Sequence, residues 1–209
     1  MAARETALNA LITCRRQSGW SNAVLKQTIA RDKLDPREAA LATRLCYGVV
    51  QNRGRLDFYL RQLLTGSLKK LHPAVRDILH MGLYQIYDMD KIPDSAAVNE
   101  SVTLVRKYGA PGSDRLVNAV LRNAVRTKGT LQEPTSYEDR YSHPAELVSL
   151  LKTALPKGTL EGVLKANNEA PKTVIQVNTL KTNGVALLEQ LRREGVEAAP
   201  HGWMPECLV

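Results

Sequence analysis

The stretch from residue 73 to residue 86, PAVRDILHMGLYQI, decides the fold of this chain. It opens with Pro73, and proline is favoured at the first helical position because its missing N–H would have no partner there. Its apolar residues recur at intervals of three and four, the spacing of one helical face. They are Val75, Ile78, Leu79, Gly82, Leu83 and Ile86. The stretch therefore predicts a helix with one side in a hydrophobic core.

Further helix signals lie on both sides of this stretch. Downstream, Asp94 or Ser95 is the predicted cap of one helix, and Ser113 or Asp114 is the predicted cap of a last one at 113–127, after the breaker cluster GAPG. Upstream, helices are predicted at 2–17, 21–29, 36–51 and 56–64, and the third begins with a capping box, DPRE at 35–38. The first part of the chain is therefore predicted to be entirely helical, with Gly48 allowing two helices to approach closely.

Polar residues lie beside or within the predicted apolar faces. They are Tyr84, Gln85, Asn99, Glu100 and Asn118. Since buried polar groups need hydrogen-bond partners, these residues either tie the helices together or line a shallow site.

The positive charge belongs to the helical part of the chain. The formal net charge is +8; residues 1–140 contain 22 Lys and Arg against 14 Asp and Glu, whereas residues 141–209 contain 7 of each. In the last predicted helix, Arg115, Arg122 and Arg126 fall on the side opposite the apolar residues. This stripe is either a solvated face or a phosphate-binding face, because the planar guanidinium group suits phosphate.

The sequence changes character after residue 128. Residues 129–142 are polar and are predicted to be a linker. Residues 143–209 combine helix patterns with a predicted strand at 173–177, a helix at 183–193 and a weak strand at 196–199. They indicate a small α/β (α+β) domain.

Three spaced motifs carry a resemblance to a known family. Residues 73–85, residues 93–102 and the sequence NAVLR at 118–122 resemble the NusB fold. The last motif is most similar to the NusB-like domain of the RsmB/Sun family of bacterial small-subunit ribosomal RNA (cytosine-5) methyltransferases. YSHP at 141–144 and NEAP at 168–171 resemble the domain that precedes the catalytic domain in that family.

The resemblance implies a mainly α fold: an all-α NusB-like RNA-binding domain at 1–128, a linker at 129–142 and a small α/β domain at 143–209. The chain would be the N-terminal fragment of a longer enzyme, binding small-subunit ribosomal RNA and its own catalytic domain. Residues 4, 15 and 16 would join the arginine stripe if the first and last helices pack side by side. The candidate RNA-binding residues are Arg4, Arg15, Arg16, Arg115, Asn118, Arg122, Arg126 and Lys128.

No catalytic, cofactor-binding or metal-binding residue is predicted in the chain. S-adenosylmethionine is implied for the parent enzyme alone, because the glycines at 109–112 lack the preceding strand of a cofactor loop. Cys207 is predicted to have no catalytic role. The three widely spaced cysteines, Cys14, Cys46 and Cys207, indicate a reduced, cytoplasmic protein. No metal or membrane partner is predicted. The fragment alone is therefore expected to be inactive.

Two other functions fit the sequence. A NusB-type transcription antitermination factor would share the helical domain but would not need residues 143–209. An intramolecular scaffold would dock on the catalytic domain and would bind RNA with weak salt dependence.

Overall fold

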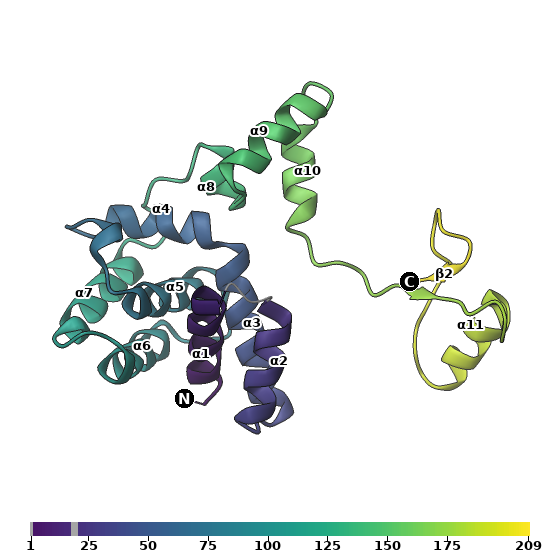
Figure 1. Cartoon of the computed structure of the whole chain (residues 1–209), viewed down its shortest axis with the longest axis horizontal. Helices are drawn as coiled ribbons and strands as arrows, with labels where there is room; N and C mark the ends of the chain where they lie inside the picture. The colour runs from purple at the N-terminus through teal and green to yellow at the C-terminus, as the bar shows by residue number, and fades with distance from the viewer. Residues whose placement is uncertain (1, 18–20) are drawn as a thin grey trace. The chain divides into compact units, whose positions relative to one another are not determined.

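The computed structural model describes residues 2–17 and 21–209. The elements in chain order are α1 (Ala2–Gln17), α2 (Ser21–Arg31), α3 (Pro36–Gln51), α4 (Arg53–Leu63), the 3₁₀ helix η1 (Leu68–Lys70), α5 (Pro73–Asp88), α6 (Asp94–Tyr108), α7 (Ser113–Arg126), α8 (Tyr137–Tyr141), α9 (Ala145–Ala154), α10 (Leu160–Asn167), β1 (Ile175–Gln176), α11 (Gly184–Arg193) and β2 (Cys207–Leu208) (Figure 1). The chain divides into two compact units, up to residue 168 and from residue 169 onward. The expectation of a mainly α fold is confirmed.

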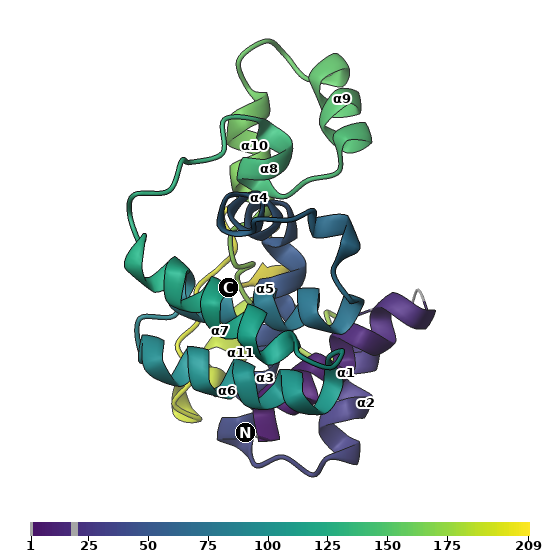
Figure 2. The same cartoon turned by 90° about the vertical axis from the view of Figure 1, so that its left-hand side faces the viewer.

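Helix α5 is the centre of the first unit. It packs against α6, α7, α3, α1 and α4 (Figure 2). Pro73 occupies its first turn, and Ile78, Leu79 and Leu83 are fully buried. The apolar face predicted for residues 73–86 therefore lies at the centre of the hydrophobic core.

The helix starts confirm some predictions and correct others. Asp35 caps α3 by accepting a hydrogen bond from the Glu38 N–H at 2.9 Å, but the Glu38 carboxylate accepts from the Ala3 N–H at 2.7 Å and so links α3 to α1. Among the predicted caps of α6 and α7, none is correct: the caps are Pro93 and Gly112, without side-chain hydrogen bonds. Gly112 has φ +78°, a conformation that glycine adopts at little cost, so the turn is complete before residue 113.

The close approach predicted at Gly48 is confirmed. A Cβ at this position would lie 2.5 Å from Tyr84 Oη and even closer to the tyrosine ring. The absence of a side chain on α3 therefore makes room for an aromatic ring on α5.

The segment expected to be a linker contains helix α8. The Ser136 hydroxyl caps it, and the Arg61 guanidinium on α4 pairs with Asp139 at 2.8 Å. Helices α9 and α10, expected in the second domain, lie in the first compact unit and share a small core of Val148, Leu160 and Leu164. Where the domains divide in solution stays a prediction.

In the second unit, β1 and β2 form an antiparallel pair in which Ile175 faces Leu208. The strand expected at 173–177 is present only at residues 175–176, and the strand expected at 196–199 is absent. Only its last residue, Ala199, pairs with Val209, through two hydrogen bonds of 2.8 Å. Gly195, with φ +78°, ends the turn after α11, so little extended chain remains before that pairing.

Candidate nucleic-acid interface

Helix α7 has one buried and one basic side. Val117, Val120, Leu121 and Ala124 are buried. The three arginines at positions 115, 122 and 126 are exposed. At about 100° per residue, these spacings place the arginines opposite the apolar residues. The predicted arginine stripe is therefore an exposed surface.

Two of these arginines donate hydrogen bonds to neutral side chains. Arg122 Nε donates to Asn118 Oδ1 at 3.0 Å, and Arg126 Nη2 donates to Asn123 Oδ1 at 3.3 Å. In the described part of the chain, neither guanidinium forms an ion pair. Their positive charges are thus oriented by asparagines without being cancelled.

A groove runs between α6 and α7 beside this stripe. Val98, Ala119 and Val125 form its apolar part, Ser95 and Asn99 contribute polar groups, and its volume is about 630 Å³. Asp94, Arg122 and Arg126 also line it. Lys128 Nζ lies 3.7 Å from Asp94 Oδ1, so this acidic residue is partly neutralised.

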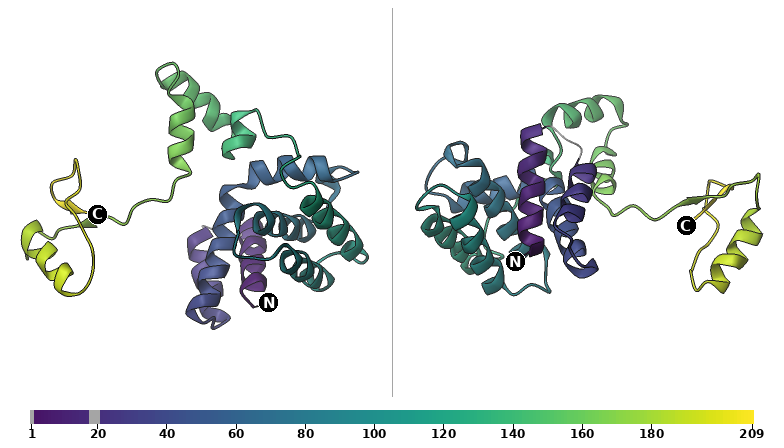
Figure 3. Two further views of the ribbon diagram at one scale, coloured as in Figure 1. Left: turned by 180° about the vertical axis from the view of Figure 1, so that it is seen from behind. Right: turned by 60° about the horizontal axis from the view of Figure 1, so that its bottom comes forward.

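The arginines of α1 do not join the α7 stripe. Helix α1 packs chiefly on α3, α2 and α5, whereas α7 packs chiefly on α6 and α5. In both views of Figure 3, α1 (purple) lies between α2 on one side and the teal helices on the other. The condition for a single basic surface, side-by-side packing of the first and last helices, is therefore not met, and α5 is the helix that packs against both.

Two α1 arginines make contacts inside the unit. Arg4 Nε donates to Gln85 Oε1 at 2.7 Å, and Arg15 Nη2 pairs with Asp77 Oδ2 at 2.9 Å. Both partners are buried residues of α5. These arginines therefore attach α1 to the central helix.

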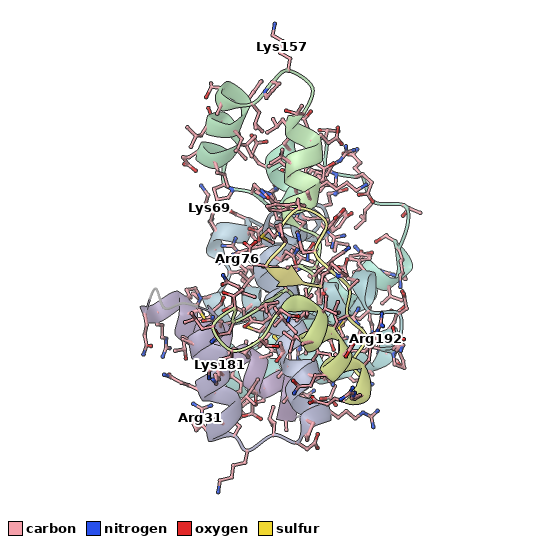
Figure 4. The ribbon with its side chains drawn as sticks, turned by 90° about the vertical axis from the view of Figure 1, so that its right-hand side faces the viewer. Arg31, Lys69, Arg76, Lys157, Lys181 and Arg192 are labelled. Atoms are coloured by element: carbon pink, nitrogen blue, oxygen red, sulfur yellow. The ribbon has the colours of Figure 1, made fainter. Side chains whose placement is uncertain are left out.

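Arg16 belongs to a second basic group. It lines a hollow of about 350 Å³ with Arg15, Arg31 and His72. The side chain of Arg31 lies at the surface at the end of α2 (Figure 4) and pairs with Asp32 at 2.7 Å. The basic residues predicted to form a single RNA-binding surface thus form two separate groups, one on α7 and one at the ends of α1 and α2. The α7 group forms fewer ion pairs with carboxylates.

The polar residues singled out in the sequence divide between the two expected roles. Gln85 is buried and ties α1 to α5, and the ring of Tyr84 packs over Gly48. Asn118 orients Arg122, and Asn99 is exposed at the groove. Gln85 and Tyr84 therefore hold the helices of the core together, while Asn99 and Asn118 belong to the α6–α7 surface.

Sequence reasoning missed a polar cluster on α4 and α5, in which His80 is buried and Asp57 and Arg76 are half-buried. His80 Nε2 lies 2.7 Å from Asp57 Oδ1, and the Arg76 guanidinium pairs with the same carboxylate. Burial raises the pKa of Asp57, but the hydrogen bonds to His80 and Arg76 outweigh it, so the pKa is lowered. Only the four-residue spacing of Arg76 and His80, which puts them on one helical face, could have indicated this cluster.

Residues 109–112 form the turn between α6 and α7, and a helix precedes them, unlike a strand–loop–helix cofactor site. Among the described residues, no three His, Cys, Asp or Glu side chains gather as metal ligands. No described helix combines the length and apolar character needed to cross a membrane.

Comparisons with known proteins agree with this architecture. Residues 1–126 match the NusB family, and residues 143–209 match the ferredoxin-like domain of RsmF/B-like methyltransferases. The chain is 32% identical over 199 residues to the probable ribosomal RNA small subunit methyltransferase B of Bacillus subtilis, covering 93% of this chain and 44% of that protein. It is 30% identical to the protein of the same name from Synechocystis, covering 100% of this chain and 48% of that one.

The chain thus spans about half the length of the curated relatives it matches. The solved structure of T. maritima NusB has the same helical fold, with a TM-score of 0.54 at 22% identity, covering 60% of this chain and 91% of that one. The resemblance seen in the sequence is confirmed: the chain belongs to the NusB family through residues 1–126 and continues into the ferredoxin-like domain of RsmF/B-like methyltransferases.

Proposed function

We propose that this chain is the RNA-binding region of an S-adenosylmethionine-dependent ribosomal RNA (cytosine-5) methyltransferase. It would position small-subunit ribosomal RNA for a catalytic domain that lies elsewhere in the longer protein. The names and lengths of the relatives support this proposal. The observation that carries it is the exposed stripe on α7, where Arg122 and Arg126 are held by asparagines.

The proposed mechanism is positioning by phosphate contact. A guanidinium group presents a planar set of donors to phosphate oxygens, and a side-chain hydrogen bond restricts its rotamers before binding. Phosphate contacts provide affinity and orientation but do not read sequence. The cofactor and the catalytic residues would come from the part of the longer protein outside this chain.

Salt-dependent RNA binding tests the proposal. The chain is titrated with a small-subunit ribosomal RNA hairpin at several salt concentrations, as wild type, Arg122→Ala and Arg126→Ala. Arg61→Ala is the matched control, because it removes the same charge from an arginine that pairs with Asp139 at 2.8 Å. Each α7 substitution is expected to lower the log–log salt slope by about one phosphate contact, roughly 0.7 to 0.9.

The outcome assigns the RNA-binding face. If the control keeps the wild-type slope and both α7 variants lose part of it, the stripe contacts phosphate. If RNA binding is strong but unaffected by both α7 substitutions, the proposed face is wrong, and Arg16→Ala tests the group on α1. Undetectable binding at low salt would contradict RNA binding by this chain.

A second function, docking on the catalytic domain, is favoured by the second unit. Leu180, Val185 and Trp203 are 96%, 70% and 79% exposed. Large apolar side chains exposed to this degree in a small unit can become buried when another domain packs on it. Trp203→Ser in the longer protein is expected to weaken the association of its domains, measured by limited proteolysis, while RNA binding by this chain stays unchanged.

A further inference from the structure

The groove between α6 and α7 has an apolar floor at its centre. Val98 is buried, while Val125 is half-buried and Ala119 exposed. The small side chains of Ser95 and Ala119 leave space between two helices that otherwise pack closely (Figure 2). The space of about 630 Å³ is open to solvent along one side, so a flat group can enter from the surface.

The rim of the groove combines cations with neutral hydrogen-bonding groups. Arg122 and Arg126 line it without ion pairs in the described part of the chain. Asn99 is exposed, and its side-chain amide makes no hydrogen bond to any described residue. An amide offers both donors and an acceptor, so it can pair with the edge of a nucleobase.

We propose that this groove holds one unpaired base of an RNA strand whose phosphates contact the α7 arginines. The inference rests on the proposed function, since it needs RNA at this face. The base would lie on Val98, Ala119 and Val125, with Asn99 and Ser95 at its polar edge. Sequence-specific recognition of RNA mostly uses such splayed-out bases, which stack on aromatic side chains or guanidinium planes. In this groove the guanidinium groups of Arg122 and Arg126 provide such planes beside the aliphatic floor.

The charges at the groove favour RNA over a protein segment. The two arginines add positive charge at the rim, and Asp94 is paired with Lys128 at 3.7 Å. The ligand that fits this lining has a negatively charged part at the arginines of the rim and a flat apolar part inside the groove. Polar atoms along one edge of the flat part would face Asn99 and Ser95. A nucleotide combines these properties in one unit. A base inside a duplex is paired and stacked, so the groove is expected to select single strands.

The test fills the groove without changing its charge. Ala119→Phe places a ring on the floor, and Ala40→Phe is the matched control because Ala40 is exposed on another helix, α3. Both variants of the full chain are titrated with a short single-stranded RNA and with a duplex of the same sequence. Ala119→Phe is expected to weaken single-strand binding by about tenfold, because the base loses the apolar area that it would bury on Val98 and Val125. Duplex binding is expected to stay within about twofold of wild type, and the salt slope is expected to be unchanged, because no phosphate contact is removed.

A second variant tests the polar edge. Wild type is expected to discriminate among poly-U, poly-C and poly-A strands, and Asn99→Ala is expected to reduce that discrimination while leaving the salt slope unchanged. The inference is overturned if Ala119→Phe leaves single-strand binding intact, as it would if the groove held a protein segment, or if single strand and duplex lose affinity equally. A loss of the salt slope in Arg122→Ala and Arg126→Ala with no effect of Ala119→Phe would leave the proposed function standing and remove the base-binding groove alone.

Discussion

The sharpest structural prediction concerns Gly48 on α3, where an added methyl group meets Tyr84 of α5. A Cβ there would lie 2.5 Å from Tyr84 Oη and closer still to the ring carbons. Heavy atoms cannot approach to that distance, so Gly48→Ala must displace the ring. The ring is half-buried against the core, and its displacement removes the packing between the two helices.

Two opposing terms set the size of the effect. Overpacking a well-packed position costs about 1–3 kcal/mol. Alanine in place of glycine inside a helix stabilises by about 0.8–1 kcal/mol. The substitution is therefore expected to destabilise the wild-type protein by roughly 1 kcal/mol. In a Tyr84→Ala background the ring is absent, and the same substitution is expected to stabilise by up to about 1 kcal/mol.

Urea unfolding followed by circular dichroism measures this double-mutant cycle through the free energies of the four proteins. Gly162→Ala is the matched control, because Gly162 lies within α10 and a Cβ there would meet nothing within 4 Å. It is expected to be neutral or stabilising in both backgrounds. A destabilisation by Gly48→Ala of equal size with and without the tyrosine ring would refute the reasoning.

Three further predictions follow from buried ionisable groups. Asp57→Asn breaks the ion pair with Arg76 and weakens the contact with His80, and urea unfolding is expected to show a loss of roughly 2–3 kcal/mol. Because the pKa of Asp57 is lowered in the folded state, its contribution to the free energy of unfolding is present above the unfolded pKa of about 3.9 and is lost as pH falls through the lower folded pKa. Urea unfolding of the variant at pH 7 and pH 3 is therefore expected to show a smaller difference in stability between the two pH values than wild type shows. An equal difference in the two proteins would contradict this. Burial raises the pKa values of Tyr59 and Tyr87 to about 12, with a further contribution from Glu133 for Tyr59. Absorbance at alkaline pH is therefore expected to show these two phenols ionising near pH 12 in the folded protein, and ionisation of both near the ordinary value of about 10 would contradict this. Burial also raises the pKa of Cys46 to about 12, and mass spectrometry after iodoacetamide treatment at neutral pH is expected to find it unmodified in the folded protein; rapid labelling would show that α3 opens readily.

Local residue patterns were enough to predict the long helices of residues 2–126. Helix formation depends on neighbours three and four residues apart, so the apolar period of 73–86 and Pro73 located α5 correctly. The cap at Asp35 and the close approach at Gly48 were likewise readable from local residue types. The arginine stripe on α7 followed from the same periodicity, because a helix with one buried side exposes the other.

Which helices contact one another depends on the packing of the folded chain and could not be predicted from the local patterns. Arg4 and Arg15 were predicted to join the α7 arginines if the first and last helices packed side by side, but the packing of α1 on α5 directs them to Gln85 and Asp77. The polar segment after residue 128 folds into α8 through contacts with α4 that no local pattern reveals. Strand β2 forms because β1 pairs with it across a long stretch of sequence, and two residues carry too little pattern to be found alone. Contacts between distant residues depend on how whole surfaces fit together, so the groove beside the arginine stripe appeared only once α6 and α7 were placed side by side.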